Sequence, residues 1–352
     1  MKIDNTTVQH LLDPTMVNET GIQCLFLIYH EMQTTKSLIT MSVIVSVWNG
    51  LLLVIALVAN GLVSAAILKN SELRSRASNT LLLLLSMSDF LVGFAVQPLY
   101  LLRRLLELQD RYICWVMVSY RVLWHLSIGT SFLIISFVAC ERYIALFYTF
   151  KYNEIITVSR LILFTGLFVA SWTLFVISRF LGLSTGRYYA AATSFIILFV
   201  TVILFVYIRI YRLARRHHSQ ISGMLSTQST TIARESKVTK TTAYIVGAVL
   251  ICYSPLLISL VAVKFFDDKL FHYYVFPVTD CMVFCNSALN PLIYCWRNTD
   301  LRRCIGRMLG IRSRREMQSQ ELFSPRRLQL HNASANSQNM ALGSSTVVNN
   351  KT

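Results

Sequence analysis

The sequence predicts an all-α membrane protein, a bundle of seven transmembrane helices followed by a short amphipathic helix on the membrane surface. Two observations predict this fold class. Hydrophobic residues make up 54% of the 352 residues, charged residues only 14%, and the mean hydropathy is +0.52, which is typical of membrane proteins. In addition, seven apolar stretches are long enough to cross roughly 30 Å of hydrocarbon. They lie at about 40–68, 78–102, 113–147, 159–181, 188–214, 241–264 and 272–296.

These stretches divide the chain into four parts. We expect an N-terminal tail at 1–37, the helix bundle at 38–297, the amphipathic helix at 298–310 and a cytoplasmic tail at 311–352. The N-terminal tail has no apolar run long enough for a signal-peptide core, so we expect it to cross the membrane uncleaved. The last part is rich in Arg, Ser, Gln and Asn and has few large apolar residues, which indicates disorder.

The distribution of basic residues predicts the orientation in the plasma membrane. Of the 33 Lys and Arg residues, 23 lie in the segments 69–76, 142–160, 209–240 and 297–351. Because short cytoplasmic loops carry the excess of basic residues, we expect an extracellular N-terminus and a cytoplasmic C-terminus. Glycosylation sequons at Asn5 and Asn18 fall in the tail that this orientation places outside.

The net charge of +16 predicts contact with membrane lipids and not with nucleic acid, because the basic loops would flank an anionic leaflet. The short C-terminal helix fits the same interpretation. It opposes Leu301, Ile305, Met308 and Leu309 to Arg302, Arg303 and Arg307. Cys304 on this helix is either palmitoylated or a small packing residue.

The last apolar stretch carries polar residues that lipid cannot satisfy. It reads Asn286-Ser287-Ala288-Leu289-Asn290-Pro291-Leu292-Ile293-Tyr294. Pro291 removes a backbone hydrogen bond, and buried amides need partners from other helices. Asp89 in the second stretch is an equally costly group, because a carboxylate in apolar surroundings needs a cation or a proton.

No catalytic motif is present. The sequence has no His-Glu-x-x-His, no Gly-x-Ser-x-Gly and no glycine-rich phosphate loop. Cys281 and Cys285 share a helical face, but a cysteine within a span is more often a packing residue than a metal ligand. We therefore do not expect an enzyme.

Several motifs together carry a family resemblance. They are Asn60, Asp89, Glu141-Arg142-Tyr143, Trp172 and Asn290-Pro291-Leu292-Ile293-Tyr294. Over about residues 40–309 the chain resembles a rhodopsin-like (class A) G-protein-coupled receptor. The resemblance implies a receptor that binds an extracellular small molecule, lipid or peptide and activates a heterotrimeric G protein by outward movement of the sixth helix. The alternative from another class is a transporter or channel with Asp89 as a cation or proton site.

The resemblance implies an allosteric sodium site and no other cofactor. Its ligands would be Asp89, Ser131, Asn286, Ser287 and Asn290. The alternative is a hydrogen-bonded polar network around a protonated Asp89, since burial shifts the pKa of a carboxyl group readily.

The resemblance also implies an activation switch. Arg142 would pair with Glu141 in its own turn and with Glu235 at the foot of the sixth helix. Tyr207 and Tyr294 match two tyrosines that move inward in the family on activation. The alternatives are a solvated charge at Glu235 and interfacial aromatic anchors for the tyrosines.

Partners on the cytoplasmic side follow from the same resemblance. Phe150, together with Arg142, matches residues that contact the G protein in the family. Serine and threonine residues of the C-terminal tail are candidate substrates of receptor kinases, and their phosphorylation would recruit an arrestin. Serine-rich disorder without regulation is the alternative.

The N-terminal side departs from the family pattern. The loop of about Leu181–Tyr188 has no cysteine, so the disulfide usual from that loop to the third helix cannot form. Cys114 near the start of the third stretch then has Cys24 as its clear candidate partner, and the alternative is two free thiols. Phe199 replaces a common proline, so the bulge usual in the fifth helix is expected to be missing.

The expected ligand pocket contains Arg121, Trp124, His125, Tyr253 and Asp280. Trp124 stands where amine receptors have an aspartate and Phe284 where opsins have the retinal lysine, which argues against both ligands. Arg121 either receives an anionic head group or pairs with Asp280, and the sequence slightly favours the pair. The closest likeness is to the melanocortin, lysophospholipid, cannabinoid and adenosine branch, which does not identify the ligand.

Overall fold

The computed structural model describes residues 17–18, 21–24, 27–29, 35–221, 247–263, 265–266 and 270–311. Predictions for Asn5, Glu235 and the tail beyond Ile311 fall outside these residues. Residues up to Leu301 form one compact unit, and residues from Arg302 onward form a second one.

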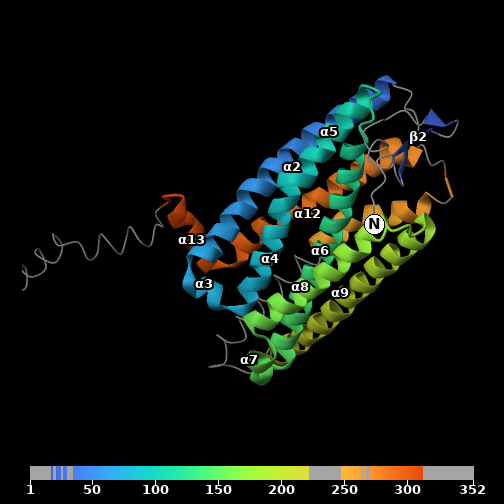
Figure 1. The fold of residues 1–352 in the computed structure, drawn as a ribbon. Coiled ribbons are helices and arrows are strands. Elements are labelled where there is room, and N and C mark those ends of the chain that lie inside the picture. The colour runs from blue at the N-terminus through green and yellow to red at the C-terminus, as the bar shows by residue number, and fades with distance from the viewer. Residues whose placement is uncertain are drawn as a thin grey trace, which may run out of the picture. The chain divides into compact units, whose positions relative to one another are not determined.

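Seven long helices make up the described part of the first unit (Figure 1), and they confirm the predicted all-α bundle. They are α2 (Lys36–Lys69), α4 (Ala77–Leu91) continuing through η1 (Val92–Val96) into α5 (Gln97–Leu108), α6 (Cys114–Phe147), α8 (Val158–Ile177), α9 (Thr185–Ile221), a helix Gly247–Ala262, and η3 (Phe271–Val275) continuing into α12 (Phe276–Arg297). By length and composition, five described helices are apolar enough to cross a membrane, and Gly247–Ala262 is a shorter apolar helix.

Short elements connect or precede these helices. They are the strands β1 (Val17–Asn18), β2 (Gly21–Cys24) and β3 (Leu27–Tyr29), and the helices α3 (Ser71–Ser75), η2 (Thr149–Lys151), α7 (Tyr152–Ile155) and α13 (Thr299–Met308). The strands form an antiparallel sheet in the order β1-β2-β3. This sheet was not expected from the sequence, and Asn18, a predicted glycosylation site, lies in β1. The helix α13 agrees with the short amphipathic helix expected at 298–310.

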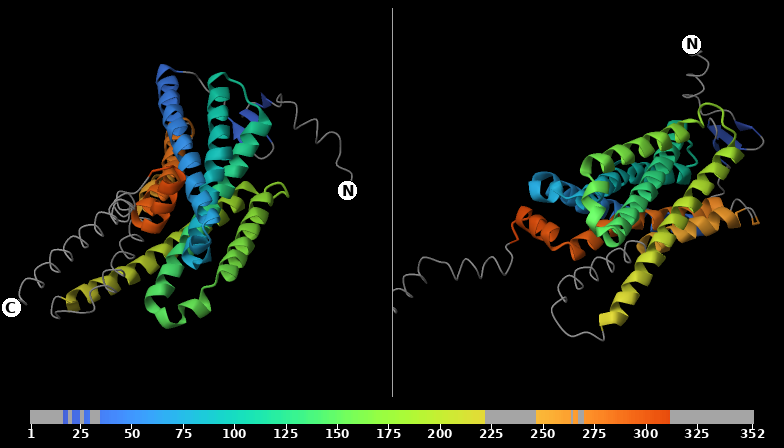
Figure 2. Two further views of the ribbon diagram at one scale, coloured as in Figure 1. Left: turned by 90° about the vertical axis from the view of Figure 1, so that its left-hand side faces the viewer. Right: turned by 90° about the horizontal axis from the view of Figure 1, so that it is seen from below.

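The helix α6 lies at the centre of the bundle. It contacts α4, α5, α8 and α9, whereas α2 contacts α4, α5 and α12. Of the most apolar part of α6, 67% is buried, against 22% in α8 and in α9. The exposed faces of α8 and α9 are therefore the lipid-facing ones. Figure 2 shows the strands beside the Cys114 end of α6, which β2 contacts.

The second transmembrane helix is longer than predicted. We expected it to end near residue 102, but α5 continues to Leu108. The three charged residues of this extension are buried, and Arg103 and Arg104 both pair with Glu107 at 2.7 Å. Internal ion pairing allows the helix to continue through three charges.

Prolines explain where the helices depart from regular α geometry. The π-helical η1 directly precedes Gln97-Pro98, and the N–H of Gln97 donates to the carbonyl of Val92. Because Pro98 has no N–H, the turn before it can widen without losing a further hydrogen bond. The helix α9, which lacks the common proline, runs as a regular α-helix from Thr185 to Ile221, as expected from Phe199.

Candidate functional site

A buried carboxylate joins the second and seventh transmembrane helices. Asp89 on α4 is completely buried and accepts hydrogen bonds from Ser287 Oγ at 2.7 Å and Asn290 Nδ2 at 2.8 Å, both on α12. Asn60 on α2 extends the network, because its Nδ2 donates to the carbonyl of Ser287 at 2.9 Å. Four of the polar residues singled out in the sequence therefore lie in one interior site.

Several amide atoms of this interior site have no hydrogen-bond partner within the described residues. They are the buried Oδ1 atoms of Asn60, Asn286 and Asn290 and the Nδ2 atom of Asn286. Ser131 on α6 is 2% exposed and lines the same small cavity as Ser287. A carboxylate beside unused amide and hydroxyl oxygens is a donor set that suits a hard cation such as sodium. The residues present thus fit the ion that the family resemblance implies.

A cavity adjoins the Asp89 site on the side of Trp124. Its lining includes Trp124, Ser131, Tyr253 and Ser287. The cavity volume is about 10 Å³, which is room for roughly one water molecule. The indole N–H of Trp124 is buried without a hydrogen-bond partner in the part of the chain that the structure describes. An acceptor group entering this cavity would satisfy that donor.

A second carboxylate is buried near the C-terminal end of α6, which we call the Arg142 end. Glu141 is 2% exposed and forms an ion pair with Arg142 Nε at 2.8 Å. The hydroxyl of Tyr152 on α7 donates to Glu141 Oε1 at 2.6 Å. Burial raises the pKa of Tyr152 above its usual value, and the nearby Glu141 carboxylate raises it further. The phenol therefore stays protonated and remains a donor.

The pair of Glu141 and Arg142 was predicted from the sequence, but the contact of Tyr152 with Glu141 was not. The contact could have been anticipated, because a buried carboxylate needs more than one hydrogen-bond partner. Tyr152, eleven positions after Glu141, is a nearby donor. Phe150, the expected G-protein contact, lies in η2 and is fully exposed. Tyr207 is half-buried on α9, and Tyr294 is buried on α12 with its hydroxyl unpartnered among the described residues.

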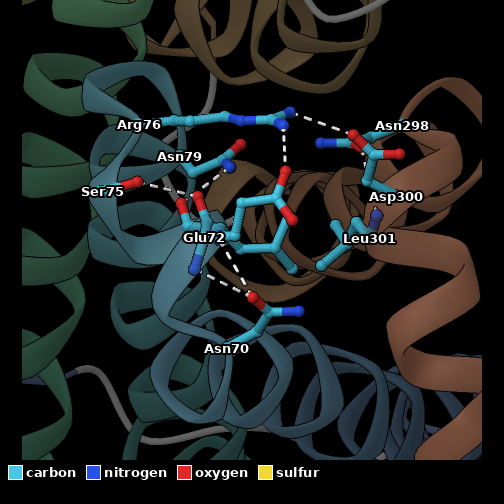
Figure 3. Close-up of polar contacts among 9 residues, drawn as sticks. Asn70, Glu72, Ser75, Arg76, Asn79, Asn298, Asp300 and Leu301 are labelled. Carbon is cyan, nitrogen blue, oxygen red and sulfur yellow. Dashed lines mark hydrogen bonds and ion pairs between the residues drawn. The ribbon is translucent and has the colours of Figure 1, made fainter.

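The turn between α3 and α4 contacts the start of α13 (Figure 3). Arg76 pairs with Glu72 at 2.6 Å and with Asp300 at 3.0 Å. Asn70 caps α3 by accepting from the backbone of Glu72, and Asn298 accepts from the N–H of Leu301 at 3.1 Å. Arg76 and Asn298 thus contact the first residues of α13, which belong to the first unit.

The other end of α6, which we call the disulfide end, carries the expected bridge. Cys24 of β2 and Cys114 of α6 form a disulfide with their Cα atoms 5.3 Å apart. Both cysteines are buried against Met117 and Val118 of α6, and the half-buried Val122 packs against this group. The N-terminal sheet is therefore covalently attached beside the interior of the bundle.

The predicted ligand-pocket residues do not line one cavity. Trp124 and Tyr253 line the cavity beside Asp89, whereas Arg121 and His125 line a second cavity, and Asp280 lines neither.

The ion pair of Arg121 with Asp280, which the sequence slightly favoured, is not formed among the described residues. Asp280 instead accepts from the hydroxyl of Tyr120 at 2.8 Å, and the Arg121 guanidinium lies over the Trp124 ring, 5.9 Å from its centroid. The reason is helical geometry. Tyr120 and Arg121 are consecutive on α6, so their side chains point about 100° apart, and only Tyr120 faces α12.

Comparison with known proteins agrees with this architecture. The family described as 7 transmembrane receptor (rhodopsin family) matches residues 59–294. A D(1)-like dopamine receptor of Oreochromis mossambicus is 26% identical over 308 residues, covering 74% of this chain and 77% of the relative. A D(5)-like dopamine receptor of Takifugu rubripes is 28% identical, with coverages of 74% and 65%. Melanocortin receptor 5 of Mus musculus is 27% identical over 263 residues, with coverages of 71% and 79%. With the family matched over most of its helix bundle, the chain belongs to the rhodopsin family of seven-transmembrane receptors.

Proposed function

We propose that this receptor binds an extracellular ligand and activates a heterotrimeric G protein by outward movement of the helix Gly247–Ala262. The observation that carries the proposal is the Asp89 site. It joins α4 to α12 through two hydrogen bonds and adjoins a cavity lined in part by Tyr253 of the helix that would move. A ligand in that cavity would contact Tyr253 and could therefore change how the helix Gly247–Ala262 packs against its neighbours.

Sodium is the proposed modulator of this movement. Asp89, Ser131, Asn286, Ser287 and Asn290 would hold the ion, which would favour the resting state by neutralising the carboxylate between α4 and α12. The unused acceptors around Asp89 support this assignment. A protonated Asp89 in a purely hydrogen-bonded network is the competing explanation.

The Arg142 end is the proposed G-protein surface. Glu141, held by Tyr152, keeps Arg142 in place in the resting receptor, and Glu235 is its proposed second partner. Outward movement of the sixth helix would release Arg142 next to the exposed Phe150. Receptor kinases and an arrestin are the proposed partners of the tail beyond Ile311.

The ligand does not follow from the names of the relatives. Dopamine is in the names of two of them, but Trp124 stands where amine receptors carry the aspartate that pairs with the amine. In this chain Trp124 is buried and lines a cavity. A biogenic amine therefore lacks its expected partner here.

The family match favours a receptor over a transporter or channel. The deciding experiment uses the full chain in lipid nanodiscs with purified G proteins and measures ligand-free nucleotide exchange. We expect exchange that falls when sodium replaces potassium at equal ionic strength, and a sodium response that is lost in Asp89→Asn. Glu235→Ala should raise exchange at equal receptor concentration.

Two outcomes would contradict the proposal. No exchange on any G-protein class, together with ion flux in liposomes, would support the transporter or channel. Nucleotide exchange that sodium does not alter would be consistent with the receptor function but would exclude the sodium site at Asp89.

A further inference from the structure

The cavity beside Asp89 is lined by a group that can only donate a hydrogen bond and by one that can only accept. Trp124 of α6 lines it, and the indole N–H of this residue is buried with no partner among the residues that the structure describes. Ser287 of α12 also lines it. The Ser287 hydroxyl already donates its hydrogen to Asp89 at 2.7 Å, so towards any other group the Ser287 oxygen acts as an acceptor.

The Trp124 side chain is held by contacts with its ring and not with its N–H group. The His125 ring meets it edge-on, with the two centroids 5.0 Å apart, and the Arg121 guanidinium lies over it at 5.9 Å from the centroid. The residue is 8% exposed. A buried indole N–H normally finds an acceptor, because leaving it without one forfeits the hydrogen bond that it makes with water in the unfolded chain. This N–H therefore requires an acceptor that the described part of the chain does not supply.

The volume and the chemistry of the cavity together identify its occupant. About 10 Å³ is room for one water molecule and not for a ring or a head group. A sodium ion could bind the Ser287 oxygen, but the positive end of the Trp124 N–H would repel it. A water molecule accepts from Trp124 and donates to Ser287, so it satisfies both. Ser131 and Tyr253 in the lining add further hydroxyl groups, and a buried water needs two to four polar partners.

We propose that one water molecule binds in this cavity, accepts a hydrogen bond from Trp124 and donates one to Ser287, and so connects Trp124 to the Asp89 carboxylate. The bonds from Trp124 to the water, to Ser287 and to Asp89 all point the same way, and hydrogen bonds in series strengthen one another. The water thereby supports the contact that joins α12 to α4. The inference rests on the proposed receptor function and deepens it, because a ligand oxygen that replaced the water at Trp124 would alter the sodium site.

The first test detects the water by NMR. The full chain, deuterated and carrying isotope-labelled tryptophan, is placed in nanodiscs of deuterated lipid. Magnetisation transfer from water to each indole N–H is then measured in the rotating frame, where dipolar transfer from bound water and proton exchange have opposite signs. The chain has five tryptophans, so the Trp124 signal is assigned by elimination from Phe variants of the other four.

Trp172 is the matched control for this measurement. It is 5% exposed, and its Nε1 donates to the carbonyl of His125 at 3.0 Å, so no water is needed there. We expect dipolar transfer to the Trp124 indole and none to that of Trp172. No transfer to Trp124, or equal transfer to both indoles, would overturn the proposal. Because the Trp124 signal is read in protein that retains this residue, the test does not depend on the folding of a Trp124 variant.

The second test asks whether the water is coupled to the sodium site. Trp124→Phe keeps an aromatic ring but removes the N–H, and ligand-free nucleotide exchange is titrated with sodium against potassium at equal ionic strength. Without the water, Ser287 is held less firmly towards Asp89. The sodium concentration for half-maximal suppression should therefore rise by about two- to tenfold, the effect of one lost hydrogen bond. Trp115→Phe, which removes an exposed indole from the same helix, should leave it unchanged. Equal titrations of Trp124→Phe and the wild type would refute the coupling.

The water site and the proposed function fail in different ways. Sodium-sensitive nucleotide exchange without transfer from water to Trp124 would refute the water site alone. Transfer to Trp124 without exchange on any G protein would leave the water site and remove the receptor mechanism. A wild type whose exchange does not respond to sodium would refute the coupling, and the first test would still decide the water site.

Discussion

The two ends of α6 hold buried polar groups in different ways. At the Arg142 end, Glu141 is bound by Arg142 beside it and by Tyr152 in the next short helix. At the disulfide end, α6 is joined to β2 by Cys24 and to α12 by Asp280, across separations of 90 and 160 residues. Local contacts can open without displacing another helix, whereas long-range contacts hold several helices together. The Arg142 end is therefore suited to switching and the disulfide end to holding a ligand cavity in shape.

The largest expected effect tests the rigidity of the disulfide end. Cys24→Ser should lower the free energy of unfolding by about 2–5 kcal/mol, the usual range for a native disulfide. Thermal unfolding in nanodiscs measures the loss, and a thiol reductant should produce the same loss in the wild type. Cys304→Ser, which removes a cysteine that forms no disulfide, is the control. A change of under about 0.5 kcal/mol would mean that the bond does not brace this end.

The middle of α6 provides the next test. A Cβ atom at Gly129 would lie 2.0 Å from the Trp172 ring, whose Nε1 donates to the carbonyl of His125. Gly129→Ala should therefore cost about 1–3 kcal/mol of stability through overpacking, measured by the same unfolding assay. Gly166→Ala on α8 meets nothing within 4 Å, so it should be neutral or slightly stabilising. Equal midpoints for both variants would show that α6 and α8 are not closely packed.

At the Arg142 end the expected effect is on signalling and not on stability. Tyr152→Phe removes one hydrogen bond from Glu141, worth about 0.5–1.5 kcal/mol, and should raise ligand-free nucleotide exchange by roughly two- to tenfold. Because burial raises the pKa of Tyr152, the phenol donates over the whole neutral range. The difference between variant and wild type should therefore be the same at about pH 6.5 and about pH 8.5.

Tyr148→Phe, an exposed tyrosine of the same loop, is the control for that experiment and should leave exchange unchanged. A difference that disappears at the higher pH would mean that the phenol ionises and that Tyr152 is not the constant partner of Glu141.

The smallest effect is expected at the junction shown in Figure 3. Arg76 and Asp300 are 45% and 44% exposed, and exposed ion pairs contribute about 0–1 kcal/mol. Asp300→Asn should therefore change the unfolding midpoint little, and less at high salt than at low salt. A loss as large as that of Gly129→Ala would show that this junction braces the bundle as strongly as its core does.

The sequence predicted contacts well where a motif is local or where an isolated polar residue lies in a span. The family resemblance placed Asp89, Ser287 and Asn290 in one site, and their side chains do meet there, because lipid leaves buried polar groups only each other as partners. Arg121 and Asp280 were paired wrongly because hydropathy gives the depth of a residue but not the rotation of its helix. The second apolar stretch was placed at about 78–102 although the helix continues to Leu108, since the pairing of Arg103 and Arg104 with Glu107 appears only once the helix is built.

The disulfide also changes the connectivity of the chain. Because Cys24 and Cys114 are 90 positions apart, their bond closes a covalent ring that contains α2, α3, α4 and α5. The chain therefore consists of a covalent ring with a tail at either end, and the remaining transmembrane helices lie on the C-terminal tail. A protease that cuts once within the ring, for example in the turn between α5 and α6, leaves both fragments on one molecule until the bond is reduced. Receptor that has been cut there would run at full mass on a non-reducing gel and as two fragments on a reducing one.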